Sequence, residues 1–291
     1  MNLERMSDMH GILHQFIRDA ATEIAAVKPD EVWRVLYDTD TYFLKRTETA
    51  HKIDDRLNRL ETSSRLLDYL SHSGFPCPKP VPTRDGGFVW EEGGGFYQLA
   101  SEISGTAAYG MENPTGTYQV GRCMGTFHTL QEESSDFTVE ISDLTPVLIS
   151  GLQRRAEELV AFGWDRRDLM EGIAEANYLA PQIWSQLAVL PAGWLHTDAS
   201  AGNFHFDGPC LSGLIDFELV PGPYLLDLGM CFVTWTFPFD VETGHMSWDL
   251  ESARALLQGY ASTRSLKESE LDNLKASFLL ASVLWWIRQA P

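Results

Sequence analysis

The sequence predicts an α+β protein with two lobes, a small N-terminal lobe built on an antiparallel sheet and a larger C-terminal lobe that is mostly helical. Three observations lead to this fold class. Strand-like runs separated by turns are concentrated in the first hundred residues, whereas helical periodicity dominates residues 115–187 and the end of the chain. The composition is 44% hydrophobic over 291 residues, which is enough for a sizeable core. We expect the lobes at residues 1–100 and 106–291, with a hinge at 101–105.

The chain begins with a helical pattern that changes into a strand pattern. Apolar residues three or four apart predict an amphipathic helix over residues 3–27. Residues 32–37 and 41–46 are rich in β-branched and aromatic side chains, and Asp38-Thr39-Asp40 separates them. These two runs therefore predict a β-hairpin.

A second helix and a second pair of strands complete the expected N-terminal lobe. Leucines and an isoleucine recur at helical spacing between residues 53 and 70, and the glycine and prolines of residues 74–80 end the helix. Two short strands at 87–91 and 96–100 enclose a turn that contains Gly93, Gly94 and Gly95.

The C-terminal lobe is expected to be helical apart from one hairpin. Helical patterns fill most of residues 115–187. Short strands at 204–206 and 211–215 surround a turn at Asp207-Gly208-Pro209. The last expected helices are at 250–260 and 268–288.

The charge of the chain excludes some classes of partner. Its 41 acidic and 22 basic residues give a formal net charge of −19 at pH 7. Such a protein repels the phosphates of nucleic acids and anionic membranes, so we expect neither as a partner. Cationic or zwitterionic small molecules remain compatible with it.

The sequence is typical of a cytoplasmic protein. No run reaches the roughly 18 apolar residues of a membrane helix, and the N-terminus lacks the pattern of a secretory signal. Four scattered cysteines, Cys77, Cys123, Cys210 and Cys231, form no C-x-x-C pair, which argues against a zinc site and a disulfide framework. We expect them to be buried free thiols in a reducing compartment.

Three polar side chains form a candidate catalytic set in the stretch WLHTDASAGNFHF, residues 194–206, and shortly after it. Asp198, Asn203 and Asp216 occur in this order, and Asp216 follows a predicted strand. Phosphoryl transfer needs a carboxylate to receive the proton of the acceptor hydroxyl, and oxygen ligands for a divalent metal. Each residue alone is common in turns, whereas the combination indicates chemistry.

These motifs resemble the aminoglycoside phosphotransferase, choline kinase and homoserine kinase superfamily, which has a protein-kinase-like fold. HTDASAGN resembles the catalytic loop of that family, and LSGLIDFE resembles its metal-binding segment. The resemblance implies that Asp198 is the catalytic base, that His196 braces the loop, and that Asn203 and Asp216 bind Mg²⁺. YLLDLG, with Asp227, is similar to the segment that supports the catalytic loop in the family.

The same resemblance nominates an ATP site in the N-terminal lobe. TYFLKR resembles the strand that carries the ATP-binding lysine, which implies Lys45. Glu61 is its candidate ion-pair partner, with Asp54 and Asp55 as rivals on the same helix. YQLASEISG resembles the hinge between the lobes, where the backbone groups of Ser101, Glu102 and Ile103 would bind the adenine edge. GRCMGTFH, ending in His128, and the helices after residue 252 also resemble family segments.

Two features depart from the family pattern. No glycine occurs between Gly11 and Gly74, so the loop that covers the phosphates in protein kinases lacks its usual residue. Thr197 stands where the family usually has glycine. Because a β-branched residue resists left-handed backbone angles, Thr197 must keep an ordinary φ or carry strain.

The leading functional hypothesis is an ATP- and Mg²⁺-dependent kinase that phosphorylates a hydroxyl group of a small molecule. An amine-bearing acceptor suits the acidic chain. The resemblance of the C-terminal helices to type II homoserine kinases implies a homoserine-like amino alcohol first, and an aminoglycoside-type antibiotic comes second. Two alternatives remain open: a pseudokinase or accessory binding protein, and a kinase of serine or threonine in a peptide.

Overall fold

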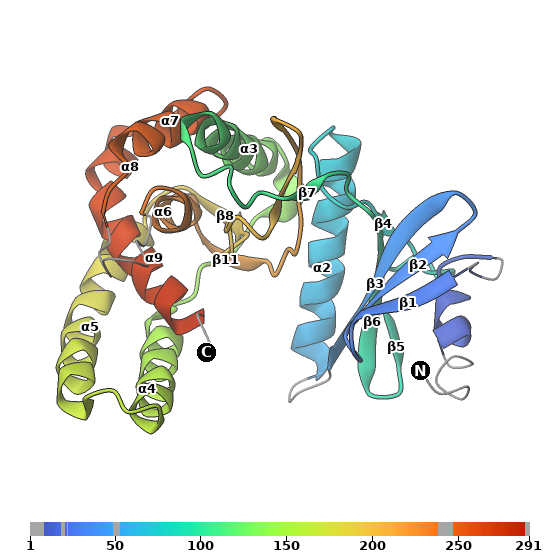
Figure 1. Cartoon of the computed structure of the whole chain (residues 1–291), viewed down its shortest axis with the longest axis horizontal. Helices are drawn as coiled ribbons and strands as arrows, with labels where there is room; N and C mark the ends of the chain where they lie inside the picture. The colour runs from blue at the N-terminus through green and yellow to red at the C-terminus, as the bar shows by residue number, and fades with distance from the viewer. Residues whose placement is uncertain (1–8, 19–20, 22, 49–52, 238–246, 289–291) are drawn as a thin grey trace. The chain divides into compact units, whose positions relative to one another are not determined.

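The computed structural model describes residues 9–18, 21, 23–48, 53–237 and 247–288 (Figure 1). Contacts within the chain divide it into two compact units. The first comprises Met1–Gly105 with Ser212–Ile215, and the second comprises Thr106–Leu211 with Asp216–Pro291. The first unit is built on an antiparallel sheet and the second is mostly helical, which confirms the predicted α+β class.

An antiparallel sheet forms the centre of the first unit. Its strand order is β1-β2-β3-β6-β4, and β5 pairs with β6. The predicted hairpin is confirmed as β2 and β3, whose turn places Asp38 at a φ of 56°. The strands are β1 (Glu23–Lys28), β2 (Val32–Tyr37), β3 (Asp40–Glu48), β4 (Pro80–Val81), β5 (Trp90–Glu92) and β6 (Gly95–Ser101).

Each face of this sheet is covered by a helical segment. Trp33, Leu44 and Leu99 are register partners on one face, and they are buried together with Met9 and Leu13 of the N-terminal segment. The predicted second helix is confirmed as α2 (Ile53–His72). It covers the opposite face, as the hydrogen bond from Gln98 of β6 to Ser64 of α2 demonstrates.

The predicted helix over residues 3–27 is wrong at its C-terminal end. Residues 9–13 are helical, but Glu23–Lys28 form β1 and pair with β2. The backbone hydrogen bonds made along β2 override the helical preference of the glutamate and alanines in this segment. Residues 1–8, 19–20 and 22 of the predicted helix lie outside the described part of the chain.

The predicted strand at 87–91 begins only at Trp90. The cause is Glu61 of α2, whose carboxylate accepts the backbone N–H of Phe88 at 3.0 Å and of Val89 at 2.9 Å. These two amide groups are therefore paired with a side chain instead of a neighbouring strand.

The second unit contains the helices that the sequence predicts, together with short strands (Figure 1). None of the helices within the described residues is long and apolar enough to cross a membrane. The helices are α3 (Pro114–Glu132), α4 (Thr145–Ala161), α5 (Arg166–Leu187), α6 (Tyr224–Trp235), α7 (Leu250–Ala261), α8 (Glu268–Asp272) and α9 (Leu274–Arg288). Its strands are β7 (Thr106–Ala107), β8 (Ala192–Leu195), β9 (Phe204–Asp207) and β11 (Val220–Pro223), while β10 (Cys210–Leu214) begins in this unit and has its last three residues in the first.

The sequence does not predict the elements at the centre of this unit. Strands β8 and β11 form an antiparallel pair, and α6 follows β11 directly. Nearly every residue of α6 is buried, and Ser277 of α9 donates a hydrogen bond to the carbonyl oxygen of Leu225. The helix predicted at 268–288 is divided into α8 and α9 at Asn273.

The four cysteines are free. Cys77, Cys123 and Cys231 are buried as predicted, whereas Cys210 is exposed at the start of β10. Burial raises the pKa of the Cys77 thiol to about 12, so this group stays protonated at neutral pH.

Glycines allow α3 and α7 to cross at close range. A Cβ atom on Gly121 of α3 would lie 2.1 Å from the carbonyl oxygen of Leu256, and one on Gly259 of α7 would lie 2.0 Å from that of Tyr118. Both distances are far inside van der Waals contact. The crossing therefore requires glycine on both helices, and it places the last turn of α7 against residues 118–122 of α3.

We predict that Gly259→Ala destabilises the protein. The added methyl group meets main-chain atoms that cannot move without shifting a helix, so the free energy of unfolding should fall by about 1–3 kcal/mol. Urea unfolding followed by circular dichroism measures this change. The matched control is Gly172→Ala in α5, where a Cβ atom has no neighbour within 4 Å. Alanine there should stabilise the helix by up to about 1 kcal/mol. A Gly259→Ala protein as stable as the wild type would contradict the tight crossing.

Candidate functional site

The candidate site of the second unit is built around the loop of residues 196–203, which connects β8 to β9. Register pairing of Leu195 with Val220 fixes the end of β8 against β11. His196 and Ala199 are fully buried, whereas Asp198 and Asn203 are half-buried. The loop thus has buried anchors and accessible polar side chains between them.

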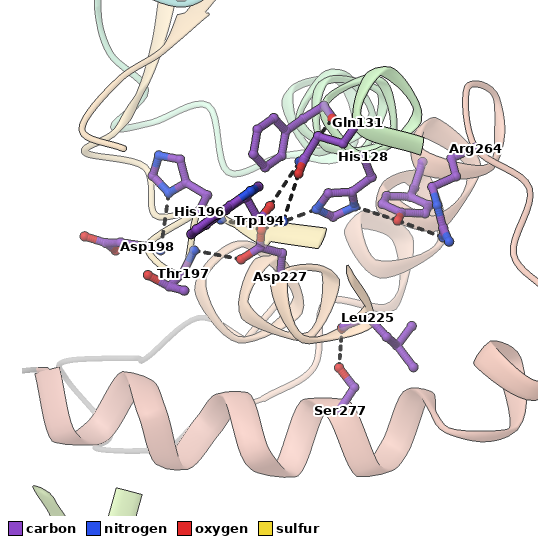
Figure 2. A network of polar contacts seen from close by, with 12 residues as sticks. His128, Gln131, Trp194, His196, Thr197, Asp198, Leu225, Asp227, Arg264 and Ser277 are labelled. Carbon is purple, nitrogen blue, oxygen red and sulfur yellow. Dashed lines mark hydrogen bonds and ion pairs between the residues drawn. The ribbon is translucent and has the colours of Figure 1, made fainter. Parts of the chain in front are cut away.

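A buried carboxylate holds the start of this loop. Asp227, in the first turn of α6, accepts the backbone N–H of His196 at 2.6 Å and of Thr197 at 2.7 Å (Figure 2). It also contacts the Nε2 atom of His128 at 3.3 Å. A carboxylate that is only 1% exposed is stable there because each contact offsets part of its lost hydration. The backbone of the loop is therefore fixed by charge-assisted hydrogen bonds.

Thr197 takes the strained alternative that the sequence leaves open. Its φ is 65°, in the left-handed region that β-branched residues avoid. Such a conformation costs roughly 1–3 kcal/mol and persists only where neighbours impose it, here the bond from its N–H to Asp227. The strained turn directs the next side chain outward: in Figure 2 the carboxylate of Asp198 points away from Asp227.

The middle of the loop is anchored by α6 through main-chain atoms. The carbonyl oxygen of Ala199 accepts hydrogen bonds from Trp235 Nε1 at 2.8 Å and from Thr234 Oγ1 at 2.9 Å. The carbonyl oxygen of Ala201 accepts the N–H of Ala108 at 2.9 Å. These bonds are accepted by main-chain atoms of the loop. They fix the path of its backbone and leave its side chains available for other contacts.

Asn203 is oriented by the loop itself. Its Nδ2 group donates to the carbonyl oxygen of Asp198 at 2.8 Å, and its backbone N–H donates to that of Ser200 at 3.0 Å. Because the Nδ2 group is engaged, the side chain presents its Oδ1 atom as an acceptor. An amide oxygen is a ligand type that Mg²⁺ accepts.

Asp216 follows β10 and is exposed, with a φ of 60°. Its neighbour Phe217 packs edge-on against the ring of His196, with centroids 4.8 Å apart. The Nδ1 atom of His196 in turn accepts the N–H of Asp198 at 3.3 Å. His196 therefore connects the segment that contains Asp216 to the loop that contains Asp198.

The side chains that the sequence nominates for a metal are oxygen donors. Within the described residues, no group of three or more His, Cys, Asp or Glu side chains is arranged to hold a metal ion. Asn203 and Asp216 would offer one amide oxygen and one carboxylate, both hard ligands, and their joint binding of a metal stays a prediction. This donor set fits Mg²⁺, which commonly takes one or two protein carboxylates and completes its shell with phosphates and water.

In the first unit, Lys45 of β3 lies on the sheet face that α2 covers. It is the register partner of Gln98, and opposite residues of an antiparallel pair point to the same face. The Nε2 atom of Gln98 contacts α2 at Ser64 Oγ (2.8 Å) and at the carbonyl oxygen of Leu60 (3.4 Å). The carboxylate of Glu61 accepts the N–H groups of Phe88 and Val89. Its pairing with Lys45 stays a prediction, and the side chains of the rival residues 54 and 55 lie outside the described ones.

The residues nominated for the adenine edge lie at the end of β6. The N–H of Ser101 donates to the carbonyl oxygen of Lys79, and the N–H of Glu102 donates to that of Thr41, each at 2.9 Å. Both amide groups are therefore engaged within the first unit. Adenine recognition by this segment would have to use the N–H of Ile103 or the carbonyl oxygens.

The polar contacts around Asp227 and His128 in the second unit also involve Gln131, Tyr260 and Arg264, which the sequence does not nominate. The side-chain amide of Gln131 pairs with the backbone of Trp194, donating to its carbonyl oxygen at 3.0 Å and accepting its N–H at 2.8 Å. Tyr260 contacts the Nδ1 atom of His128 at 2.7 Å. The available signal for Gln131 is its helical spacing from His128, since residues three apart share a helix face. No local pattern indicates the other two.

The chain matches the model of the phosphotransferase enzyme family over residues 21–266. The homoserine kinase of Agrobacterium fabrum (strain C58 / ATCC 33970) is 32% identical over 215 residues, an alignment that covers 72% of this chain and 62% of that protein. The chain thus spans less than two thirds of the length of this relative.

Solved structures share the fold. An aminoglycoside phosphotransferase from Alicyclobacillus acidocaldarius subsp. acidocaldarius DSM 446 superposes with a TM-score of 0.63 at 18% identity, covering 95% of this chain and 89% of that one. Amicoumacin kinase hAmiN, in complex with AMP-PNP, Ca²⁺ and Ami, gives a TM-score of 0.63 at 15% identity, covering 98% and 85%. At these identities the likeness establishes the fold, which confirms the predicted kinase-like class.

We predict that Asp227→Asn destabilises the protein and loosens the loop. One carboxylate oxygen becomes an NH₂ group that faces a donor, so a buried N–H loses its acceptor. The free energy of unfolding should fall by about 2 kcal/mol, and amide exchange at His196 and Thr197 should accelerate. Chemical denaturation and hydrogen exchange measure the two effects. Asp207→Asn, at an exposed position of β9, is the control and should change neither. Unchanged exchange in Asp227→Asn would show that Asp227 does not hold the loop.

We predict that Thr197→Gly raises the free energy of unfolding by about 1 kcal/mol. Glycine reaches the left-handed region without the clash of a Cβ atom, so the strain at this position is relieved. Thr197→Val, which keeps the β-branch, is the matched control and should not gain stability. Thermal unfolding of both variants compares them. A Thr197→Gly protein less stable than the wild type would mean that the threonine makes contacts worth more than the strain.

Proposed function

The chain belongs to the phosphotransferase enzyme family, and from this premise we propose that it transfers the γ-phosphoryl group of ATP to a hydroxyl group of a small molecule. The observation that carries the proposal is the 196–203 loop, whose backbone is bonded to Asp227 while Asp198 faces outward. A fixed backbone with an accessible carboxylate is what a proton acceptor in phosphoryl transfer requires.

Asp198 is the proposed catalytic base. The acceptor oxygen forms a bond to the γ-phosphorus, the bond from that phosphorus to the β–γ bridging oxygen breaks, and ADP leaves. The hydroxyl proton passes to the carboxylate of Asp198. His196, named with Asp198 as a catalytic-loop residue, is proposed to brace the loop without touching substrate, because it is a buried ring that accepts the N–H of Asp198 and packs on Phe217.

Asn203 and Asp216 are the proposed metal ligands, through Oδ1 of the amide and through the carboxylate. A divalent metal, Mg²⁺ in our proposal, neutralises charge on the transferring phosphoryl group when it is bound. Lys45 is proposed to bind the α- and β-phosphates, with a carboxylate of α2 such as Glu61 beside it, and Ile103 to contact adenine. The AMP-PNP and Ca²⁺ bound to amicoumacin kinase hAmiN support nucleotide and divalent-metal use in this fold.

The turn between β1 and β2 gives little help with phosphate binding. It is short and acidic: Asp30 has a φ of 61°, and Glu31 pairs with Lys28 at 2.5 Å. Such a turn repels phosphates and presents few backbone N–H groups to them. Binding of the nucleotide phosphates therefore depends on Lys45 and on the metal. We expect phosphoryl transfer to require the metal strictly.

The proposed acceptor is an amine-bearing alcohol. The relative from Agrobacterium fabrum carries the name homoserine kinase, which supports a homoserine-like amino alcohol as the first candidate. The formal net charge of −19 favours cationic or zwitterionic acceptors generally. Aminoglycoside-type antibiotics are the second candidate. The comparisons give no support to a non-catalytic or peptide-directed role.

The test is ADP release from ATP with a panel of acceptors, and Asp198→Asn is the decisive variant. We expect turnover with at least one amino alcohol in the presence of Mg²⁺ and none after chelation. Asp198→Asn should lower kcat by about 10²–10⁴-fold while nucleotide affinity changes little, because only the proton acceptor is lost.

Asp207→Asn, on the same unit and exposed, is the control and should keep wild-type kcat. Nucleotide binding by calorimetry separates the remaining outcomes. ATP binding without turnover of any acceptor would favour the non-catalytic alternative. Turnover that survives Asp198→Asn would remove Asp198 from its proposed role.

A further inference from the structure

We propose that Tyr260 and Arg264 are positioning residues of the 196–203 loop, which they hold through a chain of hydrogen bonds running in one direction from Arg264 to Asp227. The inference deepens the proposed function, because the loop it positions is the one that carries Asp198. Neither residue reaches the reacting groups itself; both act through His128.

The chain of contacts is continuous and buried (Figure 2). Arg264 Nη1 donates to the hydroxyl of Tyr260 at 3.1 Å, and this hydroxyl contacts His128 Nδ1 at 2.7 Å. His128 Nε2 lies 3.3 Å from Asp227 Oδ2, which accepts the N–H of His196 at 2.6 Å. These side chains are at most 4% exposed, so water does not offer them alternative partners.

The direction of the chain follows from the donors that each group possesses. A guanidinium donates and never accepts, so the oxygen of Tyr260 is the acceptor for Arg264. The carboxylate of Asp227 only accepts, so Nε2 of the ring carries the proton that faces it, and Nδ1 of a neutral ring accepts the proton of the Tyr260 hydroxyl. The tautomer of His128 that donates to Asp227 is thus stabilised at its other nitrogen by Tyr260 of α7.

The protonation states agree with this direction. Burial is the main cause that lowers the pKa of His128 below its usual range, which keeps the ring neutral. Burial likewise raises the pKa of Tyr260, so its hydroxyl keeps the proton that it donates. The groups facing His128 are Asp227 of α6, Arg264 after α7 and Glu132 of α3, and their opposing charges partly cancel.

Two carboxylates fix the start of the chain. Arg264 is 4% exposed, and it forms ion pairs with Glu270 of α8 and Glu132 of α3, each at 2.8 Å. Glu270 also accepts the N–H of Lys267 at 3.1 Å, which ties its carboxylate to the start of α8. The guanidinium is therefore held in one orientation, and Nη1 remains directed at Tyr260. The segment after α7 thus supports the loop from a distance in sequence of more than sixty residues.

Loss of the Tyr260 hydroxyl has a defined consequence. Without a donor at Nδ1, His128 can place its proton there, and the lone pair of Nε2 then faces the carboxylate of Asp227. Asp227 would lose one of its donors, and the loop that it anchors would become less well defined. Asp198, one residue beyond Thr197, would be displaced from its productive position. Loss of the hydroxyl should therefore lower kcat and leave KM unchanged, because Tyr260 is not proposed to contact either substrate.

The experiment compares Tyr260→Phe with the wild type by kinetics and by imidazole ¹⁵N NMR. We expect the kcat of Tyr260→Phe to fall about tenfold with KM for both substrates within twofold, and amide exchange at His196 and Thr197 to accelerate. Wild-type His128 should show a protonated Nε2 and an unprotonated Nδ1, and Tyr260→Phe should lose this pattern. The signal is assigned by its absence in His128→Gln.

Tyr224→Phe is the matched control, since this buried ring stacks on His128 at 4.4 Å while its hydroxyl is outside the chain of bonds. It should keep kcat and the His128 tautomer. A wild-type His128 protonated at Nδ1 or at both nitrogens would overturn the proposal even if Tyr260→Phe fails to fold. Unchanged kcat and unchanged amide exchange in a folded Tyr260→Phe would overturn it as well. Absence of turnover in the wild type would instead count against the proposed function, because the NMR and exchange results do not depend on activity.

Discussion

The candidate site depends on one buried interaction, the bonding of two successive backbone N–H groups, those of His196 and Thr197, to the carboxylate of Asp227. A carboxylate without water is costly unless donors surround it, so Asp227 and the loop stabilise each other. Its place in the first turn of α6 adds the favourable end of the helix dipole. The strained φ of Thr197 persists because the hydrogen bond from its N–H to Asp227 offsets the conformational energy.

The rest of the loop is held mainly through backbone atoms. The carbonyl oxygens of Ala199 and Asp198 are the acceptors for Trp235 and Asn203, respectively. Side chains between these anchors are small, which leaves the outward surface to Asp198 and Asn203. This division leaves Asp198 and Asn203 accessible in a loop whose threonine has a left-handed φ.

Much of the fold and part of the site follow from local sequence. The period of two in residues 32–46 and the helical spacing after residue 53 are strong signals, and both elements form as predicted. Residues 23–28 mislead because their helical preference is overridden by pairing with β2. Asp198, Asn203 and Asp216 are nominated by the motifs that contain them, and their roles stay a prediction. Arg264 resembles a surface arginine in sequence, whereas it is 4% exposed in the structure.

The sequence by itself determined the α+β class, because periodicity is a short-range property, and its motifs indicated the family and the polar residues proposed for phosphoryl transfer by resemblance. Only the tertiary structure decided how those residues are held. The glycine crossing of α3 and α7 brings His128 to Tyr260, and the fold of α6 brings Asp227 to His196, over separations of 132 and 31 residues. Such contacts are made when helices pack, and no local pattern encodes which buried donor will meet which acceptor.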